Sequence, residues 1–312
     1  TRPQSGSFAK AVVFPGGVCE PADEAHRWLD LLGSFGYTQQ DFASLHRPES
    51  AVTPTFQKNP VQRHIELRIT AIRETFEELG LLICSQRKKG DRSGIWADTV
   101  SVNVKHWQKQ VSSNPEELYN LCIEHNCYPD IWALHYWSNW LTPLQPTKRF
   151  DTTFFVTALQ NKFGIEASSE VTKTEWLRPV DILNKPDRTL FPPQVYELYR
   201  LSQVTDIEEL ITFARNRSGY GTELLFPLDL KAKDGALRIL PGDDLYPSSV
   251  DYNDNKLKYT DKTILELREG CKTLHRLEIN KNTKQTDFVL QNYKPEHHIN
   301  MGDVIFPCQN SL

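Results

Sequence analysis

The chain has 312 residues, of which 39% are hydrophobic and 24% are charged, and its formal net charge is −4. This composition is typical of a globular chain, and no apolar run approaches the ~18 residues that a membrane span needs. Because nucleic-acid binding requires a concentrated positive field, the charge balance gives no reason to expect a nucleic-acid partner, although a small anionic substrate needs only a local group of cations.

The N-terminal part is expected to form a short strand and a short helix around a polar insertion. Residues 11–14 are a β-prone run that stops at the breaker Pro15-Gly16-Gly17. The apolar side chains of residues 28–32 favour a short helix. From Tyr37 to Pro60 the sequence is polar and dotted with prolines, and we interpret residues 20–60 as an insertion.

Residues 61–82 carry a helical pattern. Apolar side chains recur there at spacings of three and four residues, as they do on one face of an α-helix. The stripe consists of Ile65, Ile69, Ile72, Phe76 and Leu79. Gly80 stands where such a helix would end, and the stripe should anchor the helix against a sheet.

The second half mixes helices and strands. We expect a helical stretch over residues 100–124, with a cap and first turn at 114–117 in its middle, and further helices over 192–201 and 205–216. Residues 150–159 are β-rich, and short strand candidates separated by turns fill the remainder. Because strands and helices do not alternate regularly, the pattern favours an α/β or α+β sandwich.

Three carboxylates gather on one side of the helix predicted over residues 61–82. Glu74 stands three residues before Glu77 and four before Glu78, so their like charges repel by ~0.2–0.5 kcal/mol per pair on an isolated helix. Oxygen-rich clusters of this kind suit hard divalent cations such as Mg²⁺. An acidic helix face is more often simply solvated, so the helix alone leaves both interpretations open.

The segment from Arg73 to Leu81 resembles the signature of the Nudix hydrolases, Arg-Glu-apolar-x-Glu-Glu-x-Gly-apolar, with Thr75 at its first apolar position. Phe14–Val18 resembles the first half of that signature, so the insertion splits it. The resemblance implies an α/β/α sandwich. We expect a Nudix domain over residues 1–200 and a C-terminal extension over 201–312.

One acid of the signature lies beyond the insertion point. Counting from Gly17, it falls at Asp23, a shorter acid than the usual glutamate, with Glu20 and Glu24 as nearby alternatives. In the family this acid orients the helix arginine, here Arg73.

The resemblance also implies a metal site and catalytic roles. The implied ligands of Mg²⁺ or Mn²⁺ are Glu74, Glu77, Glu78 and a backbone carbonyl at Gly17. Bound metal ions neutralise diphosphate charge and lower the pKa of an attacking water. Arg73 and Glu77 belong to the catalytic set, with Glu77 as the first choice of proton acceptor. Glu170 is a second candidate for that role or a further metal ligand, and its alternative is a plain surface acid.

Several runs are similar to one branch of the family, the animal peroxisomal coenzyme A diphosphatases. They are Arg2–Gly17, Arg149-Phe150-Asp151-Thr152, the Glu170 to Trp176 spacing, Pro192-Pro193-Gln194 and Leu240–Tyr246. The resemblance implies that coenzyme A or acyl-coenzyme A is the substrate and is cut to 3′,5′-ADP and (acyl-)phosphopantetheine. It favours a peroxisomal location, with a mitochondrial one as the alternative; the Asn310-Ser311-Leu312 tail lacks the basic middle residue of a peroxisomal address. For the oligomeric state we favour a monomer.

Substrate contacts are expected from arginines and aromatic side chains. Arg2 and Arg149 suit phosphate, because a guanidinium group can bind it in bidentate fashion. Arg149 could equally pair with Asp151. The aromatic residues Trp132, Tyr136, Trp137 and Trp140 either stack on adenine, line an acyl channel or form ordinary core.

Two other classes of function remain open. The chain could hydrolyse another diphosphate, such as a nucleotide sugar, a dinucleotide or an RNA cap. Alternatively, it could be a Nudix-like binding module without catalysis, although retention of Arg73 and three mutually repelling carboxylates argues against that.

The cysteines and histidines suggest no site of their own. The six cysteines are scattered without the close pairs of a zinc site, and we expect reduced thiols in an intracellular compartment. Cys127 lies near His125 without a further motif, which gives no support to a cysteine protease. His297-His298 is expected on an exposed stretch without further zinc ligands.

Overall fold

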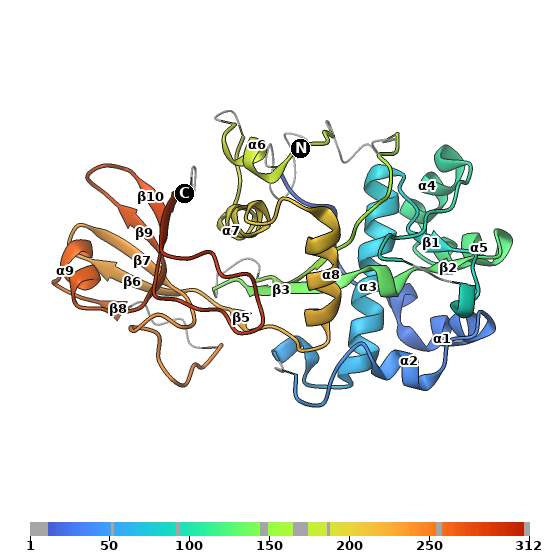
Figure 1. Cartoon of the computed structure of the whole chain (residues 1–312), viewed down its shortest axis with the longest axis horizontal. Helices are drawn as coiled ribbons and strands as arrows, with labels where there is room; N and C mark the ends of the chain where they lie inside the picture. The colour runs from blue at the N-terminus through green and yellow to red at the C-terminus, as the bar shows by residue number, and fades with distance from the viewer. Residues whose placement is uncertain are drawn as a thin grey trace. The chain divides into compact units, whose positions relative to one another are not determined.

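The computed structural model describes residues 12–50, 53–91, 94–143, 149–164, 174–185, 188–253 and 258–308. The chain divides into two compact units, and Figure 1 colours it from blue at the N-terminus to red at the C-terminus. The first unit consists of Thr1–Trp137, Phe154–Trp176 and Asp206–Gly221; the second consists of Ser138–Thr153, Leu177–Thr205 and Thr222–Leu312. Within the described residues, no helix is both long enough and apolar enough to cross a membrane.

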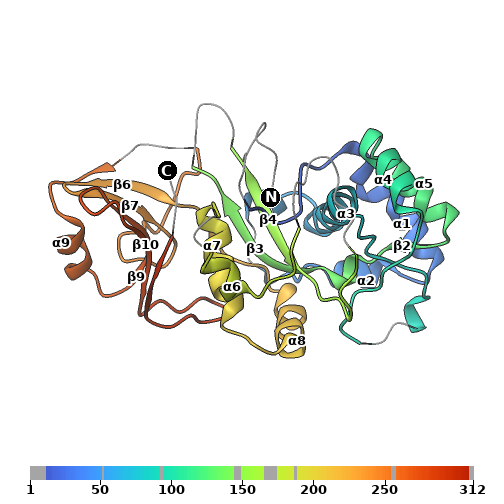
Figure 2. The ribbon, with the colours of Figure 1, turned by 90° about the horizontal axis from the view of Figure 1, so that it is seen from above.

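The first unit is mainly helical. Its α-helices are α1 (Ala25–Ser34), α2 (Gln39–Ala43), α3 (Pro60–Leu79), α4 (Val104–Ser113), α5 (Glu117–Glu124) and α8 (Ile207–Ser218). Short 3-10 helices are η1 (Pro21–Asp23), η2 (Pro54–Phe56), η3 (Lys89–Asp91) and η4 (Ile131–Ala133). Strands β1 (Cys84–Ser85) and β2 (Tyr128–Pro129) pair antiparallel. Helices α1, α2 and α4 all contact α3, and Figures 1 and 2 show them gathered around it.

Helix α3 confirms the helix predicted from the apolar stripe. Pro60 occupies its first turn, where a missing N–H does no harm. Gly80 ends it in the left-handed conformation at φ 70°, with its N–H donating to the carbonyl of Phe76 at 2.8 Å. The stripe residues Ile65, Ile69, Ile72 and Phe76 are fully buried in the core of the first unit. This packing fixes the helix face that carries the carboxylates.

Two further helix predictions for the first unit are confirmed, and one strand prediction is wrong. The helix predicted around residues 28–32 is α1, and the stretch 100–124 forms α4 and α5 with the break at Asn114, as the predicted cap required. The strand predicted at 11–14 is wrong for residues 12–14, which form no strand; a run this short needs a partner strand, and Phe14 instead packs edge-to-face on Phe154 at 5.9 Å.

Three of the cysteines, which lie apart in the sequence, meet in the structure. Cys84, Cys122 and Cys127 lie in the core of the first unit with their sulfur atoms within 4.8 Å of one another. Sequence spacing could not show this, because β1 follows α3 and pairs with β2, which follows α5.

A three-stranded sheet has the order β4-β3-β5, formed by β3 (His135–Leu141), β4 (Asp151–Val156) and β5 (Leu224–Leu225). Strands β3 and β5 run parallel. Strand β4 confirms the β-rich segment predicted at 150–159, and α8 confirms the helix predicted at 205–216.

The second unit contains a six-stranded sheet of order β11-β10-β9-β7-β6-β8. Its strands are β6 (Leu228–Ala232), β7 (Gly235–Ile239), β8 (Lys258–Tyr259), β9 (Leu274–Asn280), β10 (Thr286–Gln291) and β11 (Val304–Pro307). Its helices are α6 (Pro179–Leu183), α7 (Pro192–Ser202) and α9 (Ile264–Glu269). Helix α7 confirms the helix predicted from Pro192-Pro193, whereas α9 was not predicted.

Helices α7 and α9 cover opposite faces of this sheet. Ile264 and Leu267 of α9 join Leu237 and Ile239 in one apolar cluster. Tyr196 of α7 packs on His275 and Phe288, which belong to the other face because side chains alternate along a strand. The sheet is therefore covered on both sides.

Candidate active site

The candidate site is built around the guanidinium group of Arg73 on α3. Its Nε and Nη2 donate to the two carboxylate oxygens of Asp23, each at 2.9 Å, and Nη2 also donates to the Val18 carbonyl at 2.9 Å. Nη1 donates to Glu74 at 2.9 Å and to Glu77 at 2.8 Å. These bonds use all five N–H groups of the arginine, so one side chain ties the loop before α1 to the acidic face of α3.

Asp23 is the acid that pairs with the helix arginine, as the count from Gly17 suggested. It is 1% exposed and also accepts from the Thr70 hydroxyl at 2.8 Å and from the Glu20 backbone N–H at 3.0 Å. The alternative acid Glu24 instead approaches His26 at 3.5 Å. The shorter aspartate therefore reaches Arg73 because η1 brings its backbone close to α3.

Gly17 passes directly over the Glu74 carboxylate. A Cβ atom built on Gly17 would overlap the carboxyl carbon and both oxygens of Glu74, so only glycine allows this approach. Neighbouring Gly16 has φ 155°, a conformation that side chains rarely adopt. The sequence predicted this turn as part of the metal site, and the structure places it against one of the three predicted carboxylates.

The charge of the site is strongly negative. Asp23, Glu74 and Glu77 all pair with the single cation Arg73, and Glu78 is only 4% exposed on the same helix. Burial raises the pKa of Glu74; the charge of Arg73 opposes this rise and the nearby Glu77 adds to it. Oxygen donors in this number around one arginine fit a hard divalent cation, which would balance the remaining charge.

An acidic hollow of about 460 Å³ adjoins this loop. Its lining includes Asp23, Glu20, Glu24 and Glu66, and among the residues that the structure describes, Arg63 is the one cation of the lining. Arg63 pairs with Glu66 at 3.2 Å. No sequence pattern indicated this hollow, because its walls come from both ends of the insertion.

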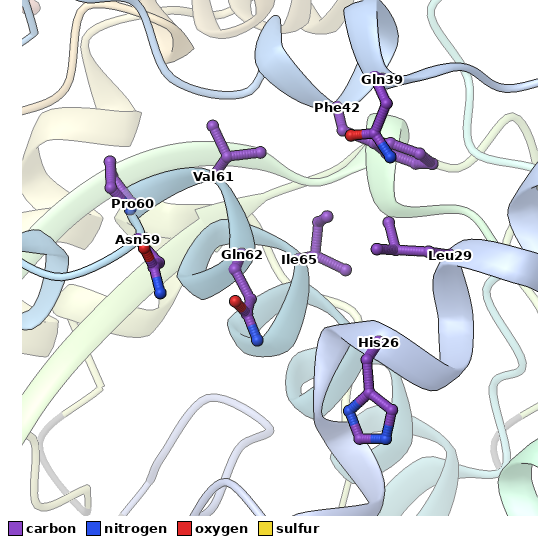
Figure 3. Close-up of a pocket in the computed structure, with 9 residues that line it drawn as sticks. All are labelled: His26, Leu29, Gln39, Phe42, Asn59, Pro60, Val61, Gln62 and Ile65. Carbon is purple, nitrogen blue, oxygen red and sulfur yellow. The ribbon is translucent and has the colours of Figure 1, made fainter.

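A second pocket lies within the insertion region and was also missed. It has a volume of about 420 Å³ and lies where α1, α2 and the first turn of α3 meet. Figure 3 shows Leu29, Phe42 and Ile65 on its apolar side, with polar side chains such as His26 and Gln62 at its edge. None of the site carboxylates lines it.

The other residues predicted for the site are Arg2, Glu170 and Arg149. Arg2 and Glu170 lie outside the described residues. Arg149 belongs to the second unit, where it donates to the carbonyls of Thr142 at 3.0 Å and Tyr252 at 2.6 Å. Its predicted alternative partner, Asp151, instead accepts from Asn139 at 2.6 Å.

Three of the four aromatic residues singled out in the sequence are core residues. Tyr136, Trp137 and Trp140 are between 1% and 5% exposed. Trp132 is partly buried and stacks on Tyr37 with the ring centres 3.7 Å apart. Their burial favours the core interpretation over base stacking for these three residues.

Comparison with known proteins gives consistent results. The family model of the NUDT19 Nudix domain matches residues 1–201, and the model of the NUDT19 C-terminal domain matches residues 229–288. Acyl-coenzyme A diphosphatase NUDT19 of Xenopus laevis is 33% identical to this chain over 99% of the chain and 86% of its own length. The protein of the same name from Homo sapiens is 33% identical over 88% of this chain and 78% of its own length.

Among solved structures, a Nudix hydrolase from Alicyclobacillus acidocaldarius has a TM-score of 0.47 and 20% sequence identity. The match covers 68% of this chain and 85% of that one.

Proposed function

Because this chain belongs to the NUDT19 family of Nudix hydrolases, we propose that it hydrolyses the diphosphate bond of coenzyme A and acyl-coenzyme A. Cleavage of that bond by water would release 3′,5′-ADP and (acyl-)phosphopantetheine. The observation that carries the proposal is the set of carboxylates held around Arg73 on the signature helix, in a chain similar over 99% of its length to an acyl-coenzyme A diphosphatase.

Nudix hydrolases generally use divalent metal ions, and we propose Mg²⁺ or Mn²⁺ here. Glu74, Glu77, Glu78 and a carbonyl of the Gly16-Gly17 turn would hold the metal, since carboxylate and carbonyl oxygens are its preferred ligands. When bound, it supplies charge neutralisation at the diphosphate and a bound water of lowered pKa.

The chain's own residues prepare the site. Arg73 holds Glu74 and Glu77 in place through one nitrogen, so the two carboxylates cannot swing apart despite their like charge. The bidentate bond to Asp23 fixes the guanidinium plane itself. We assign the proton-accepting role to Glu77, because its carboxylate is partly exposed while Glu78 is buried.

The remaining site and location assignments rest on the resemblance. Glu170 stays a candidate second base or ligand, and Arg2 and Arg149 stay candidate phosphate contacts. For location we propose the peroxisome, with the mitochondrion as the alternative; the tail at residues 310–312 lies outside the described residues. Fluorescence microscopy of the tagged full chain against a peroxisomal marker tests this, and purely mitochondrial signal would contradict it.

Product analysis by mass spectrometry tests the activity. The purified protein is incubated with acetyl-coenzyme A and Mg²⁺, beside a Glu77→Gln variant and a Glu124→Gln control on the exposed face of α5. We expect 3′,5′-ADP from the wild type and the control, and at least a ~100-fold lower rate from Glu77→Gln, as expected on loss of a general base.

Two outcomes would contradict the proposal. If the folded wild type forms no product with Mg²⁺ or Mn²⁺, the coenzyme A assignment fails, and other diphosphates or a binding role come next. If Glu77→Gln keeps the wild-type rate, the proton-accepting role belongs to another residue.

A further inference from the structure

Three cysteines converge on one point in the core of the first unit. Cys84 lies in β1, Cys122 in α5 and Cys127 just before β2. Their sulfur atoms lie within 4.8 Å of one another, and all three residues are 0% exposed. All are free thiols, and the other buried cysteine, Cys308, belongs to the second unit.

Ordinary core packing does not require this arrangement. A buried free cysteine behaves as a small hydrophobic residue, and any apolar neighbour satisfies it. Here three separate elements turn their sulfurs toward one another. Hydrogen bonds from Cys122 and Cys84 lower the pKa of the Cys127 thiol to about 4, whereas burial raises the pKa of the Cys84 and Cys122 thiols. Three converging free thiols are a donor set suited to a soft cation.

A histidine lies in the same turn of the chain. The segment reads Cys122-Ile123-Glu124-His125-Asn126-Cys127, and Asn126 adopts the left-handed conformation at φ 47°. This turn lets the N–H of Cys127 donate to the carbonyl of Cys122 at 2.9 Å.

One ring nitrogen of His125 is available as a metal ligand. Its Nε2 is buried and has no hydrogen-bond partner among the described residues. A carboxylate oxygen of Glu124 lies 3.8 Å from that nitrogen, beyond hydrogen-bond distance.

We propose that Cys84, Cys122 and Cys127 bind a structural Zn²⁺ ion, with His125 as the fourth ligand. Three thiolates and one imidazole form a usual tetrahedral zinc set, with Zn–S bonds of ~2.3 Å. Such bonds place the sulfurs about 3.8 Å apart, so sulfurs already within 4.8 Å need shifts of about 1 Å or less. The three sulfurs already converge, whereas the ring of His125 would have to turn toward them to complete the set.

The site joins the segment that follows the carboxylate helix to the segment that follows α5. Cys84 lies just after the end of α3, and β1 pairs with β2 through Cys84 and Pro129. Zinc therefore stabilises the unit that carries the candidate active site without taking part in catalysis. Because thiols must lose their protons to bind, uptake of the ion releases protons.

Titration with Co²⁺ tests the proposal on the full-length, reduced protein after chelator treatment. Excess Mg²⁺ is present so that the carboxylates of the candidate active site are occupied. We expect a single equivalent of Co²⁺ to give thiolate charge-transfer bands and intense tetrahedral absorption, and Zn²⁺ to displace it. The thermal unfolding temperature should rise on zinc binding.

Matched variants locate the ligands. Cys122→Ala should lose the thiolate bands, whereas Cys308→Ala, a buried cysteine outside the cluster, should keep them. His125→Ala should keep the bands and weaken binding by roughly 10-fold or more, as expected on loss of one ligand. Circular dichroism establishes that each variant is folded.

The wild type alone can overturn the site. Absence of thiolate bands in the folded, reduced protein rejects it. Unchanged bands in Cys122→Ala reject it as well. Unchanged affinity in His125→Ala rejects the fourth ligand. None of these measurements depends on turnover of coenzyme A, so their failure and that of the proposed function are distinguishable.

Discussion

The donors of Arg73 determine where the side chains around it lie. Because a guanidinium group is planar and its N–H directions are fixed, a shift of the 17–24 loop disturbs several hydrogen bonds together. Arg73 reaches both Val18 and Asp23 of that loop. The approach of Gly17 to Glu74 is therefore a fixed feature of the site.

A Gly17→Ala substitution should reduce activity more than stability. The added Cβ would overlap the Glu74 carboxylate, which must move away from its place beside Arg73. We expect kcat/KM for acetyl-coenzyme A to fall at least ~10-fold, with a loss of unfolding free energy of about 1–3 kcal/mol from overpacking. The control Gly33→Ala in α1 has open space around its Cβ and should keep full activity. Wild-type kcat/KM in Gly17→Ala would contradict this account of the turn.

The position of three acids on one helix followed directly from the sequence, whereas the acid that pairs with Arg73 followed only from counting. Glu74, Glu77 and Glu78 followed from spacing on a helix, which is a local property. Asp23 lies 50 residues from Arg73, and its role depends on how η1 closes the loop. The cysteine cluster gave no sequence signal, because its members meet only through the pairing of β1 with β2.

At the scale of elements, the buried side chain of Arg217 joins α8 to β3, in addition to the hydrogen bond from the Tyr136 N–H to the Ser218 hydroxyl at 2.8 Å. Arg217 donates to the carbonyls of Tyr136 at 2.6 Å, Trp137 at 2.9 Å and Gly221 at 2.9 Å. All of these residues belong to the first unit, although α8 follows the predicted Nudix domain in the sequence. The predicted boundary at residue 200 stays a prediction.

Replacing Arg217 by Met should destabilise the first unit by about 3 kcal/mol, because charge-assisted hydrogen bonds to buried carbonyls are lost. Arg215→Met is the matched control, since Arg215 lies on the same helix and is exposed. Urea unfolding followed by tryptophan fluorescence measures both. Equal free energies of unfolding for the two variants would show that Arg217 does not hold α8 in place.

Elements with a strong apolar period were predicted, and β4 was predicted as a β-rich segment, but the pairing of the strands was not. Helices α3, α7 and α8 followed from periodicity and from prolines or caps at their starts. Helix α9 spans only Ile264–Glu269, too short for a period to emerge. Residues 12–14 look like a strand, yet strand formation depends on a partner that the local sequence does not specify.

For the whole molecule, the predicted class is confirmed as an α/β Nudix fold with a C-terminal extension, in a chain of the NUDT19 family. The sequence showed the helix α7 and, after residue 201, turns and short strands, but neither the six-stranded order nor the helix α9 that covers one face of the sheet. The order of the strands depends on pairing between segments far apart in the sequence, so local sequence patterns do not predict it.

Each unit also buries a neutral histidine. In the first unit, burial and the neighbouring charge of Arg68 hold the pKa of His64 far below its ordinary range. In the second, burial lowers the pKa of His275 to about 3, helped by the charge of Arg200. His275 is fully occupied: Tyr196 approaches Nε2 at 2.8 Å, and Nδ1 lies 2.6 Å from the Pro241 carbonyl.

As the pH falls, both units should therefore lose stability at pH values well above the pKa of ordinary carboxylates. Below pH ~6.5 an unfolded histidine takes up a proton, while folded His275 stays neutral until about pH 3. The unfolded state then binds more protons, so stability is full above pH ~6.5 and falls by ~1.4 kcal/mol per pH unit for each such histidine as the pH drops. Urea unfolding between pH 7.5 and 4.5 measures this slope.

The variant His275→Gln should be less stable than the wild type at pH 7.5. Its free energy of unfolding should also fall less steeply as the pH drops, by ~1.4 kcal/mol per pH unit, because one proton fewer is bound on unfolding. His26→Gln, at an exposed position, should match the wild type. A wild-type slope in His275→Gln would mean that His275 is not the group that links folding of the second unit to pH.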